Sequence, residues 1–365
     1  MKVLHFSLTP LAGMPVRLVQ ALNRHTRVQA RLADRSRFGR YDHDLVMDED
    51  PEAVLQAARD ADILHLHNYL DLDSDRFAPL DFRALQRAGK RVVRQFHTEP
   101  GFVARTMGIT PEALLAQDIP ALVIAQHPER LYRKAYVAPN FIPESRAEYA
   151  PCAEPTRWDV FYNPTMNAGA WEDRWNTKGT PQVLPLLRSL EAEGWRVRRV
   201  THIRPLAEAL PEKRSSRICL DDLVTGSYHL TGLEALAMGV CAVNFLDERS
   251  QTLIRHFSGA SGHPYVNARL EEAPAVLRRL LADPDLTREL GLRGRRWLLD
   301  HWSEARMIGH YVRAYELLLE DPALLTRQPE LSLEGRAAHF LFKELPDLAY
   351  KTRADAWDPS GDTPA

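Results

Sequence analysis

The sequence predicts an α/β protein with two doubly wound parallel sheets in tandem. Short apolar runs alternate with longer segments of helical periodicity, and this alternation is typical of parallel sheets that helices cover on both faces. After a stretch at 149–155 that contains two prolines, the same alternation starts again. With 365 residues the chain is long for a single hydrophobic core, which also favours two domains.

The first domain is expected at 1–150. Its apolar runs predict strands at 3–7, 62–66, 91–96, 121–125 and 135–138, and its periodic segments predict helices at 15–23, 51–59 and 81–88. In the first of these helices Val16, Val19 and Leu22 share one face, as the core-facing side of a helix requires.

The second domain is expected at 151–319 and a closing segment at 320–365. Apolar runs predict strands at 158–162, 196–201, 218–223 and 240–245, and periodic segments predict helices at 181–193, 231–238, 273–282, 286–300 and 303–319. Residues 354–365 are rich in Asp, Pro and Gly and are expected to form a loose tail.

Composition narrows the classes of function. The formal net charge is -2 and 26% of the residues are charged, which disfavours a nucleic-acid partner. Three cysteines are too few for a disulfide framework. The longest apolar run, 235–243, has about half the length of a membrane-spanning helix. No signal peptide is evident at the N-terminus, so a cytoplasmic protein is expected.

Ligands are expected at the carboxyl ends of the parallel strands, where two facing sheets form a cleft. The sequence contains no G-x-G-x-x-G and no G-x-x-x-x-G-K-[ST] motif, so dehydrogenase and P-loop interpretations lose their usual support. Gly13 lies in the loop after the first strand, where a glycine permits close backbone approach and exposed N–H groups favour an anion. An ordinary strand-to-helix turn explains this loop equally well.

A basic segment follows the first strand of the second domain. Lys178 and Gly179, with Arg174 one helical turn earlier, could place two cations on a diphosphate. The alternative is a solvated loop.

The segment 226–240 begins with a glycine-bearing loop and continues as a helix whose single carboxylate is Glu234. A buried carboxylate is costly without a partner, and ribose hydroxyls would supply one. The alternative is that Glu234 bonds to neighbouring backbone.

On these residues the chain resembles the retaining, sugar-nucleotide-dependent glycosyltransferases of family 4 type, which have the GT-B fold. The resemblance rests on Gly13, on the pair Lys178–Gly179, on Leu-Glu-Ala-Leu-Ala-Met-Gly at 233–239 and on the closing helices around Trp302. It implies an acceptor-side Rossmann-like domain, a nucleotide-sugar-binding Rossmann-like domain and a C-terminal segment that returns towards the first.

The resemblance also implies roles for particular residues. Lys178 and Arg174 would bind the donor diphosphate, Glu234 the ribose and His97 the donor sugar, with backbone N–H groups near Gly13 assisting. His97, Arg174 and Lys178 are the expected catalytic residues. Gly13, Lys178, Gly179, Tyr228, His229 and Glu234 are the expected donor-binding residues.

One position departs from the family pattern. The family commonly has two glutamates eight positions apart, and Gly226 stands where the first is expected. Tyr228 or His229 would then contact the sugar instead. A protein with the same fold that binds nucleotide sugars without turning them over, or acts as a scaffold, is therefore an alternative, and a sugar-nucleotide epimerase is another.

The expected activity is transfer of a sugar from a nucleoside-diphosphate sugar to an acceptor hydroxyl, with retained configuration. No metal and no cofactor besides the donor co-substrate is expected. The resemblance favours a glycan or lipid-linked acceptor in bacterial surface-glycan assembly.

Two further clusters stand outside this scheme. His65 and His67 share one face of a strand, but no third metal ligand is suitably spaced, so a structural role is expected. Seven arginines crowd the segment 17–40, namely Arg17, Arg24, Arg27, Arg31, Arg35, Arg37 and Arg40. They indicate either a solvated face or peripheral contact with an anionic membrane at its inner side.

Overall fold

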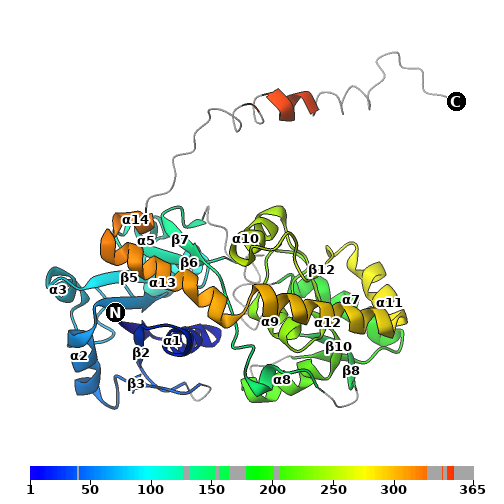
Figure 1. The fold of residues 1–365 in the computed structure, drawn as a ribbon, viewed down its shortest axis with the longest axis horizontal. Helices are drawn as coiled ribbons and strands as arrows, with labels where there is room; N and C mark the ends of the chain where they lie inside the picture. The colour runs from blue at the N-terminus through cyan, green and yellow to red at the C-terminus, as the bar shows by residue number, and fades with distance from the viewer. Residues whose placement is uncertain are drawn as a thin grey trace. The chain divides into compact units, whose positions relative to one another are not determined.

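The computed structural model describes residues 1–38, 41–125, 131–152, 156–163, 178–200, 205–326, 339 and 343–348, and every structural statement below refers to them (Figure 1). Contacts group residues 1–326 into one compact unit and 327–365 into another. Both sheets belong to the first unit, and we call the parts of it around them the N-terminal half and the C-terminal half.

The N-terminal half contains a seven-stranded parallel sheet in the order β3-β2-β1-β4-β5-β6-β7. Its strands are β1 (Lys2–Ser7), β2 (Gln29–Asp34), β3 (Leu45–Val46), β4 (Ile63–His67), β5 (Arg91–Phe96), β6 (Ala121–Ile124) and β7 (Ala135–Ala138). Its helices are η1 (Leu11–Gly13), α1 (Met14–His25), α2 (Pro51–Asp60), α3 (Phe82–Arg87), α4 (Pro100–Met107), α5 (Pro111–Ala116) and η3 (Ala147–Tyr149).

The C-terminal half contains a five-stranded parallel sheet in the order β12-β11-β10-β8-β9. Its strands are β8 (Trp158–Tyr162), β9 (Val197–Arg199), β10 (Ser216–Leu220), β11 (Cys241–Asn244) and β12 (Val266–Asn267). The helices that follow β8 are α7 (Thr180–Ala192), α8 (Leu206–Arg214), α9 (Leu230–Ala237), α10 (Glu248–Ser258), α11 (Ala273–Ala282), α12 (Pro284–His301), α13 (Glu304–Glu320) and α14 (Ala323–Thr326).

The order of strands reverses once in each sheet. In the first sheet β1 leads to β2 on one side while β4 begins the other side, and in the second sheet β8 leads to β9 while β10 begins the other side. Parallel sheets bind ligands outside the carboxyl ends of the strands at such a reversal. The loops after β1, β4, β8 and β10 are therefore the places where functional side chains are expected to meet.

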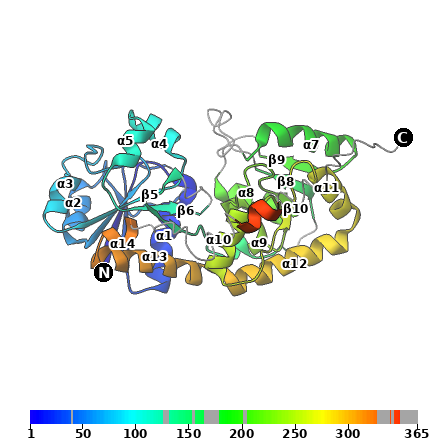
Figure 2. The ribbon, with the colours of Figure 1, turned by 90° about the horizontal axis from the view of Figure 1, so that it is seen from above.

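Helix α13 leaves the C-terminal half and packs on the first sheet, as Figure 2 shows. The Tyr311 hydroxyl donates to the carbonyl of Pro139 at 3.1 Å, and the Tyr315 hydroxyl lies 2.7 Å from Nδ1 of His65. At the crossing, Nε1 of Trp302 donates to the carbonyl of Asn140 at 2.9 Å. The closing helices thus tie the two halves together.

The prediction of two parallel α/β sheets is confirmed. The strands β2, β3 and β12 and the helices α4, α5, α8 and α10 were not predicted. In β2 the buried residues Ala30 and Leu32 alternate with the exposed Gln29 and Arg31, so the segment is half-buried and its arginine obscured the strand pattern. Strand β3 has two residues, too few for a periodic signal.

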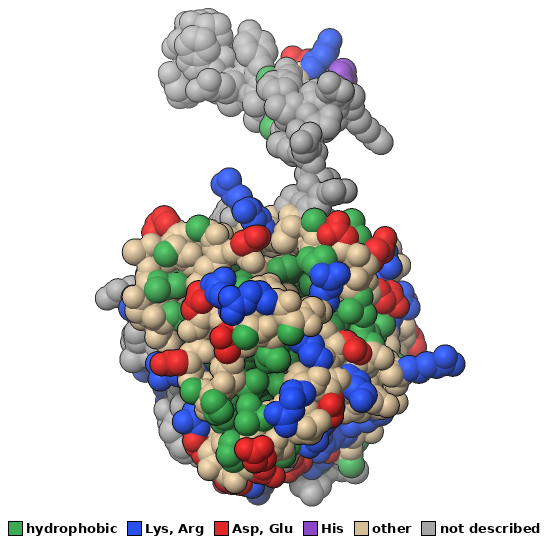
Figure 3. Space-filling model, turned by 90° about the vertical axis from the view of Figure 1, so that its left-hand side faces the viewer, with side chains coloured by type: hydrophobic (Ala, Val, Ile, Leu, Met, Phe, Trp, Pro, Cys, Tyr) green, Lys and Arg blue, Asp and Glu red, His purple; other side chains and the backbone are tan. Residues whose placement is uncertain are grey.

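The arginine cluster of the sequence is largely neutralised by ion pairs. Arg17, Arg24, Arg31, Arg35 and Arg37 pair with Glu234, Glu304, Asp44, Asp48 and Glu49 respectively. Figure 3 shows Lys and Arg side chains interspersed with Asp and Glu on the face that it displays. Within the described part of the chain, no helix is both long and apolar enough to cross a membrane. On the five arginines that these pairs engage, little free positive charge is left for membrane contact, the second of the two interpretations.

Candidate functional site

Lys178 and Gly179 end the loop after β8 in a strained backbone conformation. Both have positive φ, 51° and 66°, and a Cβ at Gly179 would overlap the side chain of Val224. Only glycine fits there without a shift. This turn starts α7 and places Nζ of Lys178 2.8 Å from Oδ1 of Asp221, with the lysine side chain 13% exposed.

Asp221 is the centre of this site, and the sequence analysis missed it. It follows β10 directly, so the reversal between β8 and β10 brings it to Lys178. Its Oδ2 accepts hydrogen bonds from the backbone N–H groups of His229 at 3.2 Å and Gly232 at 3.0 Å, at the beginning of α9. A polar residue directly after a buried strand was the available signal.

Asp221 is charged despite its complete burial. Burial by itself raises the pKa of this carboxyl, but the positive charge of Lys178, with His229 and Lys213, outweighs burial and holds the pKa below its ordinary value. His229 is fixed in turn by a 2.9 Å contact between its Nε2 and Oδ2 of Asp222. Lys178 and His229, two of the predicted residues, therefore flank one buried carboxylate.

Glu234 lies on α9 with its side chain 7% exposed. Its Oε1 pairs with Nη2 of Arg17 at 3.0 Å, and its Oε2 with Nζ of Lys213 at 2.5 Å. Burial alone would raise the pKa of Glu234. The positive charges of Lys213 and Arg17 lower it by more than burial raises it, so the pKa lies below the ordinary value. Arg17 comes from the N-terminal half, and its Nη2 also donates to the Tyr149 hydroxyl at 3.1 Å.

The two carboxylate clusters are close to each other. The charges of Lys178, Asp221, Lys213 and Glu234 all act on the thiol of Cys219, whose pKa burial raises to about 12. Cys219 lies in β10, the strand that leads to Asp221. Lys178 and Glu234, predicted to bind the diphosphate and the ribose, are thus brought to the same part of the C-terminal half.

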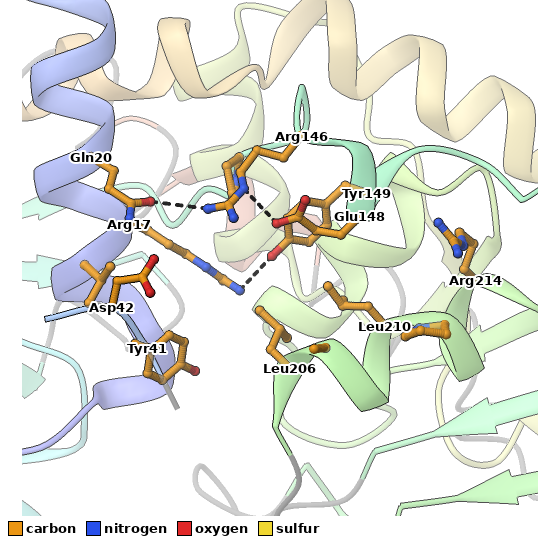
Figure 4. Close-up of a pocket in the computed structure, with 14 residues that line it drawn as sticks. Arg17, Gln20, Tyr41, Asp42, Arg146, Glu148, Tyr149, Leu206, Leu210 and Arg214 are labelled. Carbon is orange, nitrogen blue, oxygen red and sulfur yellow. Dashed lines mark hydrogen bonds and ion pairs between the residues drawn. The ribbon is translucent and has the colours of Figure 1, made fainter. Parts of the chain in front are cut away.

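A pocket of about 500 Å³ opens beside Arg17 (Figure 4). It lies between α1, residues 41–42, residues 143–149 and α8, and its volume suits a small-molecule ligand. Its charged lining residues are Arg17, Asp42, Arg146, Glu148 and Arg214. In Figure 4 Arg17 crosses the pocket towards Tyr149, while Arg146 contacts Gln20 and Glu148. Arg17 links this pocket to Glu234.

Gly13 precedes α1 with φ at 80°, and a Cβ there would overlap the ring of Tyr41. Because Tyr41 and Arg17 both line the pocket, the glycine turn positions the beginning of α1 beside it. Gly13 lies in the loop after β1, where the strand order reverses between β1 and β4.

His97 follows β5 and lies in the N-terminal half. Its backbone N–H donates to Oδ1 of Asn68 at 2.7 Å, and its Nε2 lies 2.9 Å from Nδ1 of His67. The ring is therefore held by residues at the end of β4. Lys178 and Glu234 lie in the C-terminal half, so these contacts place His97 in a different group of residues.

Tyr228 is 1% exposed, and its ring meets the ring of Trp302 edge-on at a centroid distance of 5.6 Å. It packs in the core rather than in the pocket described above. Gly226 has φ at 82°, and a Cβ there would stand 2.9 to 3.0 Å from side-chain atoms of Asp247. The N–H of Asp247 donates to the carbonyl of Gly226 at 3.0 Å. A carboxylate therefore covers the position where the family pattern has its first glutamate.

Arg249 is a second link between the halves. Its Nη1 donates to the carbonyl of Ala125, directly after β6, at 3.1 Å, and its Nη2 contacts Oγ of Ser227 at 3.2 Å. The sequence analysis did not single out Arg249. Arg174, the least regular of the predicted phosphate ligands, lies outside the described residues.

Comparisons with solved structures identify the fold. An alpha-glucosyltransferase in complex with UDP-glucose and DNA containing an abasic site is 11% identical, with 87% of this chain and 99% of that one covered and a TM-score of 0.59. The Anabaena protein HepE in complex with UDP-glucose is 12% identical (87% and 99% covered, TM-score 0.53). A sucrose-phosphate synthase from Thermosynechococcus elongatus is 14% identical (88% and 99% covered, TM-score 0.52).

No protein-family model matches the chain, and no curated protein matches it in sequence. At these identities the structural likeness establishes the fold. The chain has the GT-B fold, with two Rossmann-like domains, that glycosyltransferases share. The predicted fold class is therefore confirmed.

Proposed function

We propose that this protein is a glycosyltransferase that moves a sugar from a nucleoside-diphosphate sugar to an acceptor hydroxyl. The observation that carries the proposal is the meeting of Lys178 and the beginning of α9 around Asp221, at the strand reversal of the C-terminal half. The solved structures of the same fold named above include two complexes with UDP-glucose.

In this proposal the diphosphate lies beside Lys178. An ammonium group has three donors, and the contact with Asp221 uses one of them, so Lys178 can also donate to phosphate oxygens. Its charge would stabilise the negative charge that develops on the leaving diphosphate, which is where electrostatic catalysis acts. Backbone N–H groups near Gly13 would assist, and so would Arg174. No step requires a metal ion.

The nucleoside is proposed to occupy the pocket beside Arg17. An ionised carboxylate has about four acceptor sites, and Arg17 and Lys213 each contact one oxygen of Glu234. Ribose hydroxyls can therefore donate hydrogen bonds to the remaining acceptor sites of Glu234 once the side chain of Arg17 moves aside. The mixed polar and apolar lining of the pocket suits a nucleoside.

At the transferred sugar we propose that Asp247 supplies the carboxylate, because position 226 has a glycine where the family pattern has a glutamate. Asp247 packs over Gly226, and its side chain is 34% exposed, which leaves it open to a ligand. Its Oδ1 caps α10 by accepting the N–H of Ser250 at 2.7 Å. Its Oδ2 lies 4.0 Å from Nε of Arg249, beyond hydrogen-bond distance, so this oxygen can still accept a sugar hydroxyl. His97 and His229 are the proposed imidazoles at the same sugar.

Retention of anomeric configuration, with the leaving phosphate assisting the acceptor, is proposed on the family resemblance. So are a glycan or lipid-linked acceptor, a role in bacterial surface-glycan assembly and peripheral contact with an anionic membrane. Flotation with anionic liposomes tests the membrane contact, and equal recovery with and without anionic lipid contradicts it.

A binding or scaffolding protein without turnover is the second candidate. The observation in its favour is that both oxygens of Glu234 are already engaged by cations. An epimerase of the same fold would instead release nucleotide without an acceptor.

The deciding experiment is calorimetric titration of UDP-glucose, UDP, GDP and ADP into the full chain, followed by assays for donor hydrolysis and transfer. The proposal expects one nucleotide to bind and Lys178→Ala to lose that binding. Lys134→Ala, at an exposed lysine of the N-terminal half, is the matched control. Binding without hydrolysis or transfer supports the second candidate, and no binding by any nucleotide contradicts both.

A further inference from the structure

A group of buried histidines lies beneath α13, next to His97 of the proposed transfer site. His5 on β1 and His65 on β4 are register partners on neighbouring parallel strands. His67 lies two residues further along β4 and therefore points to the same face of the sheet. All three side chains are buried, with exposures of 0%, 0% and 1%. The sequence analysis found no third ligand for His65 and His67, and the fold supplies His5.

The three rings are close enough to share one ligand. The centroids of His5 and His65 are 4.5 Å apart, as are those of His65 and His67. One ring nitrogen from each residue lies within 4.8 Å of the other two. The Tyr315 hydroxyl adds an oxygen at 2.7 Å from Nδ1 of His65 and 3.5 Å from Nε2 of His5.

Burying three imidazole rings costs free energy. Their contacts include one another, Tyr315 and, from Nδ1 of His67, Nε2 of His97 at 2.9 Å. A shared ligand would offset that cost.

We propose that His5, His65 and His67 bind one transition-metal ion of the zinc class, with the Tyr315 oxygen as the fourth donor. Imidazole nitrogens suit Zn²⁺, Co²⁺ and Ni²⁺. Zn–N bonds of about 2.0–2.1 Å place tetrahedral ligands roughly 3.4 Å apart. The nitrogens of His5 and His67 already lie 3.1 Å apart, and the other pairs, which lie within 4.8 Å, must approach by up to about 1.4 Å. The 3.1 Å contact between His5 and His67 then gives way to two bonds to the ion.

The ion would act as a structural cross-link. His5, His65 and Tyr315 come from β1, β4 and α13, so a shared ion fixes the closing helix to the first sheet. The site is enclosed, and the ion must therefore enter before α13 packs, during folding. The inference does not rest on the proposed sugar transfer, although His67 contacts His97, one of the imidazoles proposed at the sugar.

The test is to refold the full, tag-free chain with Co²⁺ and to measure its visible absorption and metal content. We expect the bands of four-coordinate Co²⁺, about one ion per chain, and a higher melting temperature than in chelator. His65→Ala is expected to lose all three. His310→Ala changes a histidine of α13, the helix that carries Tyr315, outside the cluster. This variant is expected to keep the bands, the metal content and the higher melting temperature.

The inference is overturned if the wild-type chain refolds with Co²⁺ but shows none of these bands and has the same melting temperature with Co²⁺ as in chelator. Equal metal content in folded wild type and folded His65→Ala also overturns the inference. Should His65→Ala fail to refold, His67→Gln replaces it, because the amide fills much of the space of the ring. Retained cobalt bands in folded His67→Gln would be equally contrary.

Discussion

Arg17 on α1 and Glu234 on α9 form a 3.0 Å ion pair that joins the two halves of the GT-B fold. The two side chains are 6% and 7% exposed, so the pair is almost dry, and Lys213 completes it at 2.5 Å. Loss of one partner from a buried pair leaves a charge without compensation. The pair is therefore both a structural tie and the boundary of the proposed nucleoside pocket.

Arg17→Ala is expected to lower the free energy of unfolding by about 3 kcal/mol, because Glu234 keeps its charge and loses one of two partners. Urea unfolding measures this. Arg17→Ala combined with Glu234→Gln should cost less than the sum of the two single variants, since their effects are coupled. Arg37→Ala, which removes an exposed pair with Glu49, is the control and should cause no measurable change. Additivity of Arg17→Ala and Glu234→Gln would contradict a coupled pair.

Lys178→Ala is expected to weaken donor binding about 10- to 100-fold, as loss of a charge-assisted hydrogen bond of roughly 1.5–3 kcal/mol implies. Lys178→Arg should recover part of the affinity, because it restores the charge but not the compact ammonium geometry. Calorimetric titration of the nucleotide that binds wild type provides the measurement. Unchanged affinity in Lys178→Ala would remove the lysine from the donor site.

Helices and strands could be predicted where the apolar residues lie on one face of a helix or form one continuous run in a strand. The segment 273–282 was predicted as a helix and is α11 (Ala273–Ala282). Strand β2 escaped because Arg31 and Gln29 interrupt its buried residues. Register and strand order, which create both sheet reversals, depend on pairings between distant segments, and periodicity carries no information about those.

The candidate site could be predicted only as separate residues. Lys178 and Glu234 stood out by residue type and neighbouring glycines, but their partners did not. Asp221 is 43 residues from Lys178, and Arg17 is 217 residues from Glu234. A charged residue in an apolar segment predicts that a partner is needed, because an unpaired buried charge is costly. Which residue is the partner is known only from the folded chain. His5 was missed as the third histidine for the same reason.

Asp247→Asn is expected to reduce transfer at least tenfold while leaving stability nearly unchanged. An asparagine keeps the oxygen that accepts the N–H of Ser250 at the beginning of α10, and it removes the negative charge proposed at the sugar. Asp247→Ala should lose activity and also about 1 kcal/mol of stability with the cap. The rate of transfer and the melting temperature separate the two effects. Full activity in Asp247→Asn would show that no carboxylate is needed above Gly226.

The contribution of Glu234 to stability is expected to disappear in acid. Its pKa in the folded chain lies below its ordinary value of 4.5, because Lys213 and Arg17 favour the charged form more than burial disfavours it. A carboxyl with a lowered pKa binds fewer protons folded than unfolded, so its stabilisation is complete above pH 4.5 and is lost as the pH falls through the folded value. The difference in melting temperature between wild type and Glu234→Gln should therefore shrink below pH 4.5. Glu289→Gln, at an exposed position of α12, is the control for removal of a surface carboxylate. A constant difference for Glu234→Gln would mean that the folded chain does not lower the pKa of Glu234.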